Sequence, residues 1–422
     1  MLELSYIRQH SNRVIKNLLI KNFDAVDIVN KVLALDEKRR ALQTERDAIQ
    51  SKLNKESKLV GLLFGKNRIE EANKKKAILG ELKASIKKIE KLYKTTEEDL
   101  FVQLILLPNI PHNSVPAGQG AQDNLLVKVV DNKPDLPESA IPHWELAKKY
   151  NLIDFDLGNK ITGSGFPFYV NKGAKLQRAL ISFFLDRACD AGYIEYMPPL
   201  MVNEASGFGT GQIPDKEGQM YFVGEDKLYL IPTAEVPLTN IYRDVVLDKQ
   251  ELPLKLTAYT PCFRREAGSY GKNVRGLNRL HQFDKVEIVQ IASPDQSYHI
   301  LEMMVKHVES LVTALHLPYR ILKLCGGDIS FTSALTFDFE VYSAVQQKWL
   351  EVSSVSNFES YQANRLKLRY RDSDKKVKLA HTLNGSALAL PRILAALLEN
   401  NQTESGILIP EVLQPYTGFK YI

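Results

Sequence analysis

Two strand-like segments joined by a long cationic loop most constrain how this chain can fold. Residues 256–263 are rich in β-branched and aromatic side chains, and residues 282–291 alternate with a period of two. The loop between them contains three glycines and five cations, namely Gly268, Gly271, Gly276, Arg264, Arg265, Lys272, Arg275 and Arg279. Guanidinium groups match phosphate geometry, and glycine lets backbone approach closely. The loop is therefore suited to an anionic ligand, and a solvated basic loop is the alternative.

The composition of the 422 residues, 44% hydrophobic and 25% charged, is typical of a globular protein with two domains. No segment has the apolar core of a signal peptide or the length of a membrane span, so we expect a cytoplasmic protein without a membrane partner. The three cysteines lie far apart, and no two of the eight histidines are spaced as H-x-x-x-H. We therefore expect no metal site built from Cys or His.

The positive charge is concentrated near the N-terminus. Residues 31–95 hold 18 Lys and Arg against nine Asp and Glu, whereas the remainder holds 37 basic and 41 acidic residues. Residues 28–49 and 79–100 both carry a heptad pattern, and glycines within residues 61–65 favour a chain reversal between them. This predicts an antiparallel two-helix coiled coil with arms about 50 Å long. Arg39 and Arg46 occupy its second apolar row, where they snorkel or reach a ligand.

The strand–loop–strand segment is similar to motif two of class II aminoacyl-tRNA synthetases. Its form, C-F-R-x-E-A-G-S-x-G followed by R-G-L-x-R-x-H-Q-F-D-K-V-E, resembles the seryl-tRNA synthetase family. An amphipathic helix at 175–191, a strand at 193–199 and two prolines resemble motif one, which forms the family's dimer interface, and residues 381–392 resemble motif three. The likeness covers nearly the whole chain.

The resemblance implies an α+β chain: a class II antiparallel β-sheet catalytic domain with an N-terminal coiled-coil arm. We expect the arm at residues 1–107, a linker at 108–140 that begins in a proline-rich stretch, and the catalytic domain at 141–422. In the family the arm grips tRNA, for which the candidates here are Arg40, Lys52, Lys55, Lys58, Lys74, Lys75 and Lys76. A coiled coil that mediates dimerisation or binds another protein is the alternative.

The implied reaction is ATP-dependent activation of L-serine to seryl-adenylate, followed by transfer to the 3′ end of tRNA(Ser), by a homodimer that uses Mg²⁺. Whether tRNA(Sec) is also charged stays open. The resemblance assigns catalysis to Arg264, Glu266 and Arg392. It assigns ATP binding to Arg264, Arg265, Glu266, Phe283, Glu351, Val352, Ser353, Ser354 and Arg392. It assigns serine binding to Thr233, Ala234, Glu235, Arg264, Glu287, Asn384 and Ser386, and the metal to Glu351 and Ser354.

Three details of the sequence qualify this assignment. Strict alternation would put Glu351 and Ser354 on opposite faces of a strand, so the strand must end or bulge near Ser353. Arg265 stands where the family has a small residue, and residues 358–361 are an unusual lead into the next segment. The G-F-G-T-G run at 207–211 lacks the context of a phosphate loop, so we expect a flexible loop there.

Two other functions are compatible with the same residues. One is an RNA-binding protein that has a synthetase fold but no activity. The other is a class II enzyme specific for a different amino acid. Pyrophosphate exchange with a panel of amino acids separates all three hypotheses.

Overall fold

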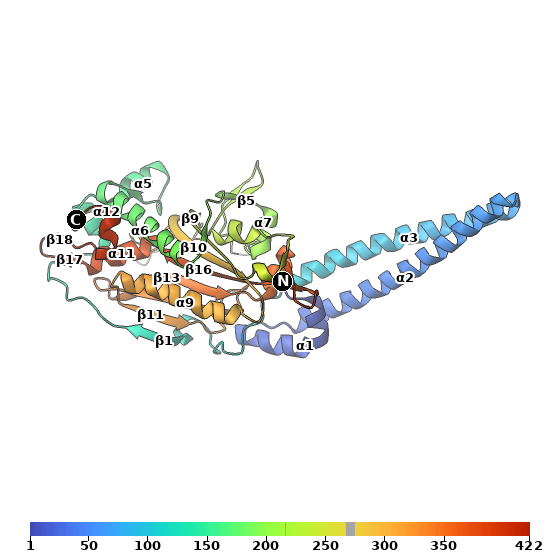
Figure 1. The fold of residues 1–422 in the computed structure, drawn as a ribbon, viewed down its shortest axis with the longest axis horizontal. Helices are drawn as coiled ribbons and strands as arrows, with labels where there is room; N and C mark the ends of the chain where they lie inside the picture. The colour runs from blue at the N-terminus through green and yellow to red at the C-terminus, as the bar shows by residue number, and fades with distance from the viewer. Residues whose placement is uncertain (216, 267–274) are drawn as a thin grey trace. The chain divides into compact units, whose positions relative to one another are not determined.

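The computed structural model describes residues 1–215, 217–266 and 275–422. Gly268, Gly271 and Lys272 of the cationic loop lie outside the described residues. The chain divides into two compact units, one formed by Met1–Leu19 with Phe23–Pro108 and the other by Ile20–Asn22 with Asn109–Ile422. The first is helical, and the second contains an eight-stranded sheet (Figure 1).

The first unit is dominated by a hairpin of two long helices, α2 (Val26–Gly65) and α3 (Ile69–Leu104), preceded by α1 (Leu4–Leu18) (Figure 1). This confirms the predicted coiled coil, but the chain reverses at residues 66–68 and not at 61–65. A glycine inside a helix costs only about 1 kcal/mol relative to Ala, so the packing against α3 carries α2 through Gly61 to its end.

The second row of the hairpin seam is built from cations and one aromatic ring. Arg39 Nη1 donates to the hydroxyl of Tyr93 over 3.3 Å, and the Arg46 guanidinium lies 5.5 Å from the centre of the Tyr93 ring. Arg39 also pairs with the buried carboxylate of Asp36 at 2.9 Å. Both arginines are therefore held within the hairpin, as snorkelling side chains would be.

The second unit is organised by a sheet with the strand order β1-β11-β12-β13-β16-β10-β9-β4. Neighbouring strands are antiparallel except for β4 and β9, which are parallel. The two strands predicted around the cationic loop are β9 and β10, paired from Leu254 with Ile291 to Phe263 with Gln282. The bounds are β1 Leu125–Val130, β4 Ile194–Glu195, β9 Leu254–Phe263, β10 Gln282–Ala292, β11 Tyr319–Lys323, β12 Leu335–Ser343, β13 Lys348–Asn357 and β16 His381–Ala389.

Smaller elements surround this sheet. The helices are α4 His143–Lys149, α5 Phe155–Ile161, α6 Asn171–Asp190, α7 Glu204–Thr210, α8 Glu235–Asn240, α9 Ser297–Ala314, α10 Ser360–Leu366, α11 Leu390–Asn400 and α12 Gln414–Thr417. The short strands are β2 Ile153–Asp154, β3 Phe168–Tyr169, β5 Met201–Asn203, β6 Phe222–Val223, β7 Leu228–Leu230, β8 Val246–Asp248, β14 Arg369–Arg371, β15 Val377–Leu379, β17 Gln402–Thr403 and β18 Gly406–Ile407. Within the described ranges, no helix is long and apolar enough to cross a membrane.

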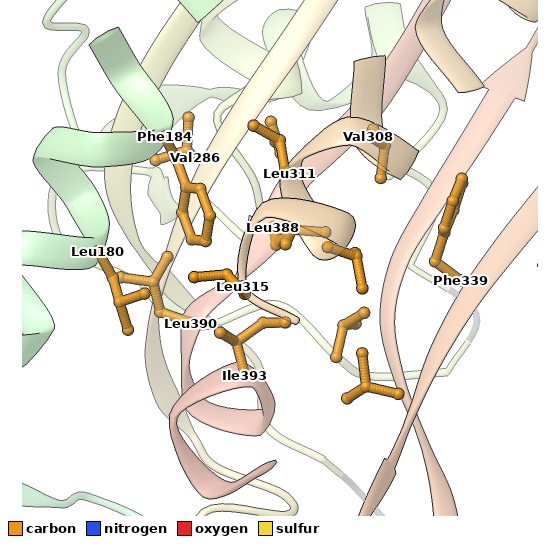
Figure 2. Close-up of a cluster of buried hydrophobic side chains, with 14 of the residues drawn as sticks. Leu180, Phe184, Val286, Val308, Leu311, Leu315, Phe339, Leu388, Leu390 and Ile393 are labelled. Carbon is orange, nitrogen blue, oxygen red and sulfur yellow. The ribbon is translucent and has the colours of Figure 1, made fainter. Parts of the chain in front are cut away.

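The main core lies on one face of the large sheet, under α6, α9 and α11. Figure 2 shows Phe184 of α6, Leu311 of α9 and Ile393 of α11 around Val286 of β10, and all four side chains are buried. Strand residues alternate between faces, so Val286 points into this core while its odd-numbered neighbours point to the opposite face. The opposite face carries the charged side chains of Lys285 and Glu287 and, further along β10, Val289 and Ile291 in smaller apolar clusters.

Two local expectations were wrong. The predicted flexible loop at 207–211 is instead helix α7, which Asn203 caps by accepting the Ser206 N–H over 2.9 Å. A Cβ on Gly209 would lie 2.5 Å from Leu366 of α10, so this glycine serves close packing between two helices. The strand predicted at 193–199 is reduced to the two residues of β4, after which the Tyr196 N–H still donates to the backbone oxygen of Thr257 in β9 over 2.8 Å.

Candidate active site

The face of the sheet away from the core gathers predicted site residues from three strands. On β10, Phe283 and Glu287 are four residues apart, so their side chains lie on the same face of the strand. Ser386 of β16 is directly opposite Glu287, and Asn384 of the same strand reaches the Glu287 carboxylate with its amide. Strand pairing alone therefore brings residues more than 90 positions apart into one site.

A bulge in β13 places Glu351 and Ser354 on the same face. Phe339 pairs with Ser353 and the next residue, Glu340, pairs with Glu351, so Val352 is the extra residue. The bulge shifts the alternation by one position, which confirms the expected irregularity near Ser353. The Val352 side chain enters the core, and the Ser353 hydroxyl donates to the backbone oxygen of Ser386 over 2.6 Å. Both side chains are buried, so we expect backbone atoms of these two residues to make the predicted ATP contacts.

The carboxylate of Glu287 is buried in a pocket of polar groups. Thr233 Oγ1 donates to Glu287 Oε2 over 2.8 Å, and Asn384 Nδ2 donates to Oε1 over 3.2 Å. The ammonium group of Lys285 lies 2.6 Å from Oε2, and its side chain is also almost fully buried. A buried carboxylate needs such partners because an unpaired charge is very costly. The Lys285 contact follows from the i,i+2 spacing in K-V-E, a signal that the sequence interpretation missed.

Glu235 lies beside this pocket and is held by a neighbouring amide. Gln362 Nε2 donates to Glu235 Oε1 over 2.7 Å, and Gln362 Oε1 in turn accepts from the Thr382 hydroxyl over 2.6 Å. Burial, together with the nearby negative charge of Glu287, raises the pKa of Glu235 to about 7. Ala234, which precedes it, is fully buried in a small apolar cluster, so only its backbone faces a ligand.

This raised pKa predicts a pH dependence. The folded protein favours protonated Glu235, so its contribution to stability is complete below the unfolded value of 4.5 and is lost as pH rises through about 7. A bound ammonium group favours the ionised carboxylate instead. We expect the KM for an amino-acid substrate to be flat above about pH 8 and to rise about tenfold per pH unit well below 7. Glu235→Gln should flatten this profile, and an unchanged profile in that variant would contradict the assignment.

The motif-two arginines diverge at the end of β9. The Arg264 guanidinium lies 5.4 Å from the centre of the Phe283 ring, on the polar face. Its positive charge offsets part of the rise in the pKa of Glu235 that burial causes. Arg265 instead stacks over Tyr221 at 5.8 Å, so its presence does not displace Arg264. Glu266 forms an ion pair with Arg279 across the loop. Glu266 thus acts on the loop, and no contact with Arg264 is seen among the described residues.

Arg392 stands in the first turn of α11, after Pro391 in the position expected for a helix start. Its Nε donates to the backbone oxygen of Asn278 over 2.9 Å, and its Nη1 donates to the backbone oxygen of Glu351 over 2.8 Å. The guanidinium is also 4.0 Å from the Glu351 carboxylate. The motif-three arginine and the predicted metal ligand therefore meet at one edge of the site.

Asp338 is a second residue that sequence reasoning missed. It lies opposite Ser354 in the β12–β13 pair, and its Oδ1 is buried without a hydrogen-bond partner among the described residues. Burial and then the charge of Glu351 raise the pKa of Asp338 well above its usual range. Only the register between two strands reveals this proximity, because Asp338 carries no local motif.

Residues 358–361, which depart from the pattern of the resembled family, have a structural role. The Glu359 carboxylate accepts from the Tyr298 hydroxyl over 2.5 Å, and its backbone N–H donates to Asn357 Oδ1 over 2.8 Å. Its backbone has φ +49°, in the left-handed region, at the start of α10. These residues turn the chain from β13 into a helix and do not alter the charged groups of the site.

An antiparallel sheet with Arg264 and Arg392 around one polar face defines a class II aminoacyl-tRNA synthetase core. The family model described as the tRNA synthetase class II core domain (G, H, P, S and T) matches residues 222–401, and the seryl-tRNA synthetase N-terminal domain matches residues 1–111. Serine–tRNA ligase from Salinibacter ruber is 50% identical over all of this chain and 99% of the relative.

Two solved structures agree with this match. Seryl-tRNA synthetase from Pyrococcus horikoshii complexed with ATP has a TM-score of 0.90 at 34% identity and covers 100% of this chain and 99% of its own. The cytoplasmic serine–tRNA ligase from Naegleria fowleri in complex with AMP has a TM-score of 0.87 at 27% identity, with coverage of 100% and 98%. The chain belongs to the seryl-tRNA synthetase family and is an aminoacyl-tRNA ligase.

Proposed function

We propose that the chain activates L-serine with ATP to seryl-adenylate and transfers the seryl group to the 3′ end of tRNA(Ser). One observation carries the proposal: the buried carboxylate of Glu287 and the guanidinium of Arg264 flank the same polar face. A zwitterionic amino acid needs a carboxylate for its ammonium group and cations for the carboxylate that attacks phosphorus. Glu287 supplies the first, and Lys285 and Arg264 supply the second.

The chain's own residues act on the first step mainly by charge. Phe283 stacks the adenine, and Arg264 binds the α-phosphate, where negative charge increases as serine attacks. Arg392 binds the far end of the triphosphate from the start of α11. Glu287 and Glu235 hold the ammonium group, and the hydroxyl of serine lies among Thr233, Asn384 and Ser386. The reaction then depends on positioning and needs no general base from the protein.

The oxygen groups of β12 and β13 fit a Mg²⁺ ion. Glu351 and Ser354 share one face after the bulge, and Oδ1 of Asp338, which has no hydrogen-bond partner among the described residues, adds a third hard ligand beside them. Mg²⁺ prefers a few such oxygens together with nucleotide phosphates and water. When bound, the ion would neutralise charge on the ATP phosphates. Glu351 would also keep Arg392 aligned through the backbone contact described above.

An amino-acid panel in ATP–pyrophosphate exchange tests the proposed function. We expect exchange with serine to exceed exchange with alanine by at least about a thousandfold in kcat/KM, because a site built around a hydroxyl is left with unpaired polar groups when that hydroxyl is missing. Exchange with a different amino acid would identify another class II enzyme. No exchange with any amino acid would favour an inactive RNA-binding protein.

The arm is proposed to bind tRNA, supported by the excess of cations in residues 31–95 and by the long hairpin that presents them. We assign the arm to residues 1–107, the linker to 108–140 and the catalytic domain to 141–422, which agrees with a compact helical unit that ends at Pro108. Charging assays with tRNA(Ser) and tRNA(Sec) decide whether the second is a substrate.

We also propose a homodimer. The edge strand β4 and the residues after it expose large apolar side chains, with Ile194 59% and Met197 94% exposed. Such exposure at a sheet edge favours pairing with a second copy. Light scattering that gives the mass of one chain would contradict it.

A cytoplasmic location fits the substrates tRNA and ATP and the three free cysteines, and cell fractionation tests it.

A further inference from the structure

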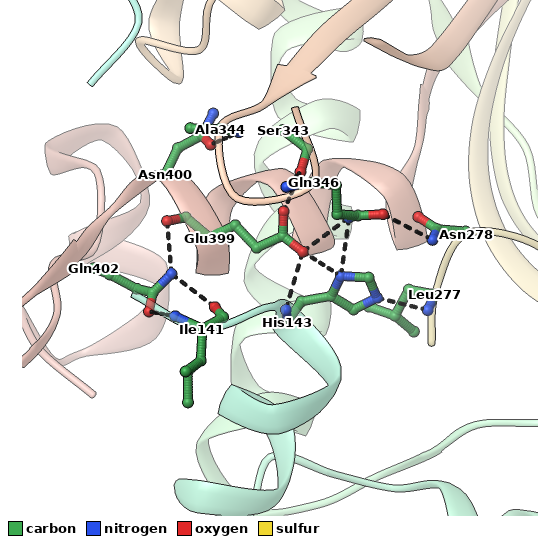
Figure 3. Close-up of polar contacts among 10 residues, drawn as sticks. All are labelled: Ile141, His143, Leu277, Asn278, Ser343, Ala344, Gln346, Glu399, Asn400 and Gln402. Atoms are coloured by element: carbon green, nitrogen blue, oxygen red, sulfur yellow. Dashed lines mark hydrogen bonds and ion pairs between the residues drawn. The ribbon is translucent and has the colours of Figure 1, made fainter. Parts of the chain in front are cut away.

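A buried polar network lies behind the nucleotide side of the proposed site. Figure 3 shows that it joins the start of α4, the turn between β12 and β13, the C-terminal half of α11 and the end of the motif-two loop. Its centre is the pair of His143 and Glu399, and both side chains are fully buried. None of the residues expected to bind ATP or serine belongs to this pair.

His143 makes a different hydrogen bond with each ring nitrogen. Its Nε2 accepts the backbone N–H of Leu277 over 2.9 Å, which requires that nitrogen to carry no proton. The proton is therefore on Nδ1, which donates to Glu399 Oε1 over 2.6 Å. This tautomer follows from the two partners, because a backbone N–H is always a donor.

Glu399 is satisfied on all sides. Oε1 also accepts the backbone N–H of His143 over 3.0 Å and Gln346 Nε2 over 2.8 Å, while Oε2 accepts from the Ser343 hydroxyl. Burial alone would raise the pKa of Glu399, but these hydrogen bonds, with that of the His143 ring first, outweigh burial and lower it. The carboxylate is thus a fixed, charged anchor at the end of α11.

The network fixes the backbone of residues 275–278. Gln346 Oε1 accepts from Asn278 Nδ2 over 3.0 Å, and the Arg275 guanidinium lies 4.8 Å from the centre of the Trp144 ring. Gly276 has φ +68°, and a Cβ there would lie 2.2 Å from His143 Nε2. The chain therefore passes so close to the imidazole that no larger residue fits.

The same backbone holds Arg392. The carbonyl oxygen of Asn278, one residue after the N–H bound by His143, accepts from Arg392 Nε over 2.9 Å. Arg392 and Glu399 are both on α11, so the helix is attached to this segment at its start directly and near its end through His143. A shift of the Asn278 carbonyl would therefore turn the guanidinium away from its ligand.

We propose that His143 is a positioning residue for ATP: its hydrogen bond to the Leu277 N–H, backed by Glu399, sets the Asn278 carbonyl that orients Arg392. This inference rests on the proposed role of Arg392 in binding the triphosphate. It predicts that the bond to Leu277, more than the pair with Glu399, determines affinity for ATP.

Two substitutions of His143 each keep one of its two ring hydrogen bonds and remove the other. Asparagine puts an amide near the Nδ1 position, so His143→Asn keeps a donor for Glu399 and loses the acceptor for Leu277. Glutamine reaches the Nε2 position, so His143→Gln keeps an acceptor for Leu277 and loses the donor. The matched control is Gln402→Met. Gln402 joins the end of α11 to the chain before α4 through hydrogen bonds of 2.9–3.0 Å to Ile141 and to the backbone of Glu399. None of these bonds reaches residues 275–278, the part of the loop that the structure describes beside His143.

The readout is serine-dependent ATP–pyrophosphate exchange with the KM for ATP and for serine measured separately, together with Tm. We expect His143→Asn to raise the KM for ATP about tenfold, and to leave the KM for serine within about twofold. His143→Gln should stay within about threefold of the wild type, and Gln402→Met should lower Tm with both KM values unchanged. A wild-type KM for ATP in His143→Asn, or equal KM values in the Asn and Gln variants, would overturn the proposal.

Arg392→Ala separates this proposal from the proposed function. Where Arg392→Ala raises the KM for ATP and His143→Asn does not, only the positioning role fails. Where Arg392→Ala has no effect on the KM for ATP, the role of Arg392 fails and the positioning role fails with it. Where the wild type shows no exchange with serine, the proposed function itself fails.

Discussion

Arg264→Ala should reduce serine-dependent ATP–pyrophosphate exchange by about 10³-fold or more in kcat/KM while the fold survives. Arg264 is the cation at the end of β9 that stands over Phe283 on the polar face of the sheet. Its charge would meet the α-phosphate where negative charge develops, and removing one such preorganised group typically costs two to three orders of magnitude or more. Its side chain fills no core cluster, so Tm should change little.

Arg265→Ala is the matched control, because it removes the same charge one residue away. Arg265 stacks over Tyr221, an interaction of about 0.5–1 kcal/mol, so its loss should reduce exchange by less than about tenfold. Exchange at the wild-type rate in Arg264→Ala, or equal losses in both variants, would contradict the assignment of the α-phosphate to Arg264.

Removing residues 28–100 should have the second large effect, on charging alone. The deletion takes away both long helices and their excess of cations, which we expect to supply most of the affinity for tRNA. Aminoacylation of tRNA(Ser) at subsaturating tRNA should fall by more than about a hundredfold. Exchange with serine should stay within about twofold, since no predicted ATP or serine ligand lies in the arm.

A variant that keeps the arm separates charge from shape. Replacing Lys74, Lys75 and Lys76 with glutamine preserves α3, because glutamine and lysine have similar helix propensities. It should weaken tRNA binding and reduce its salt dependence. Equal loss of exchange and charging in the deletion would show that the arm supports the catalytic domain and does not act as a tRNA-binding element.

Much of the site could be predicted because its residues sit in local patterns. The alternation in residues 282–291 predicted β10, and the conflict between Glu351 and Ser354 required the bulge that is found at Val352. Both inferences use only the period-two geometry of a strand. The roles assigned to these residues, in contrast, came from the resemblance and stay proposals until they are tested.

What the sequence did not reveal depends on contacts between distant segments. The glycines at 207–211 predicted a loop, because no feature of the neighbouring sequence shows that Leu366 packs against Gly209. Asp338 and Gln362 carry no motif, and only strand register and helix packing bring them to Ser354 and Glu235. The end of α2 was misplaced for the same reason, since contacts with α3 outweigh the low helix propensity of glycine.

A crystal structure with a non-hydrolysable seryl-adenylate analogue is the most direct measurement of the central claim. We predict a single bound molecule, with its ammonium group on Glu287, its phosphate mimic on Arg264 and its adenine on Phe283. A seryl-adenylate analogue bound away from the polar face of β10, or one that leaves both Glu287 and Arg264 without contact, would contradict it.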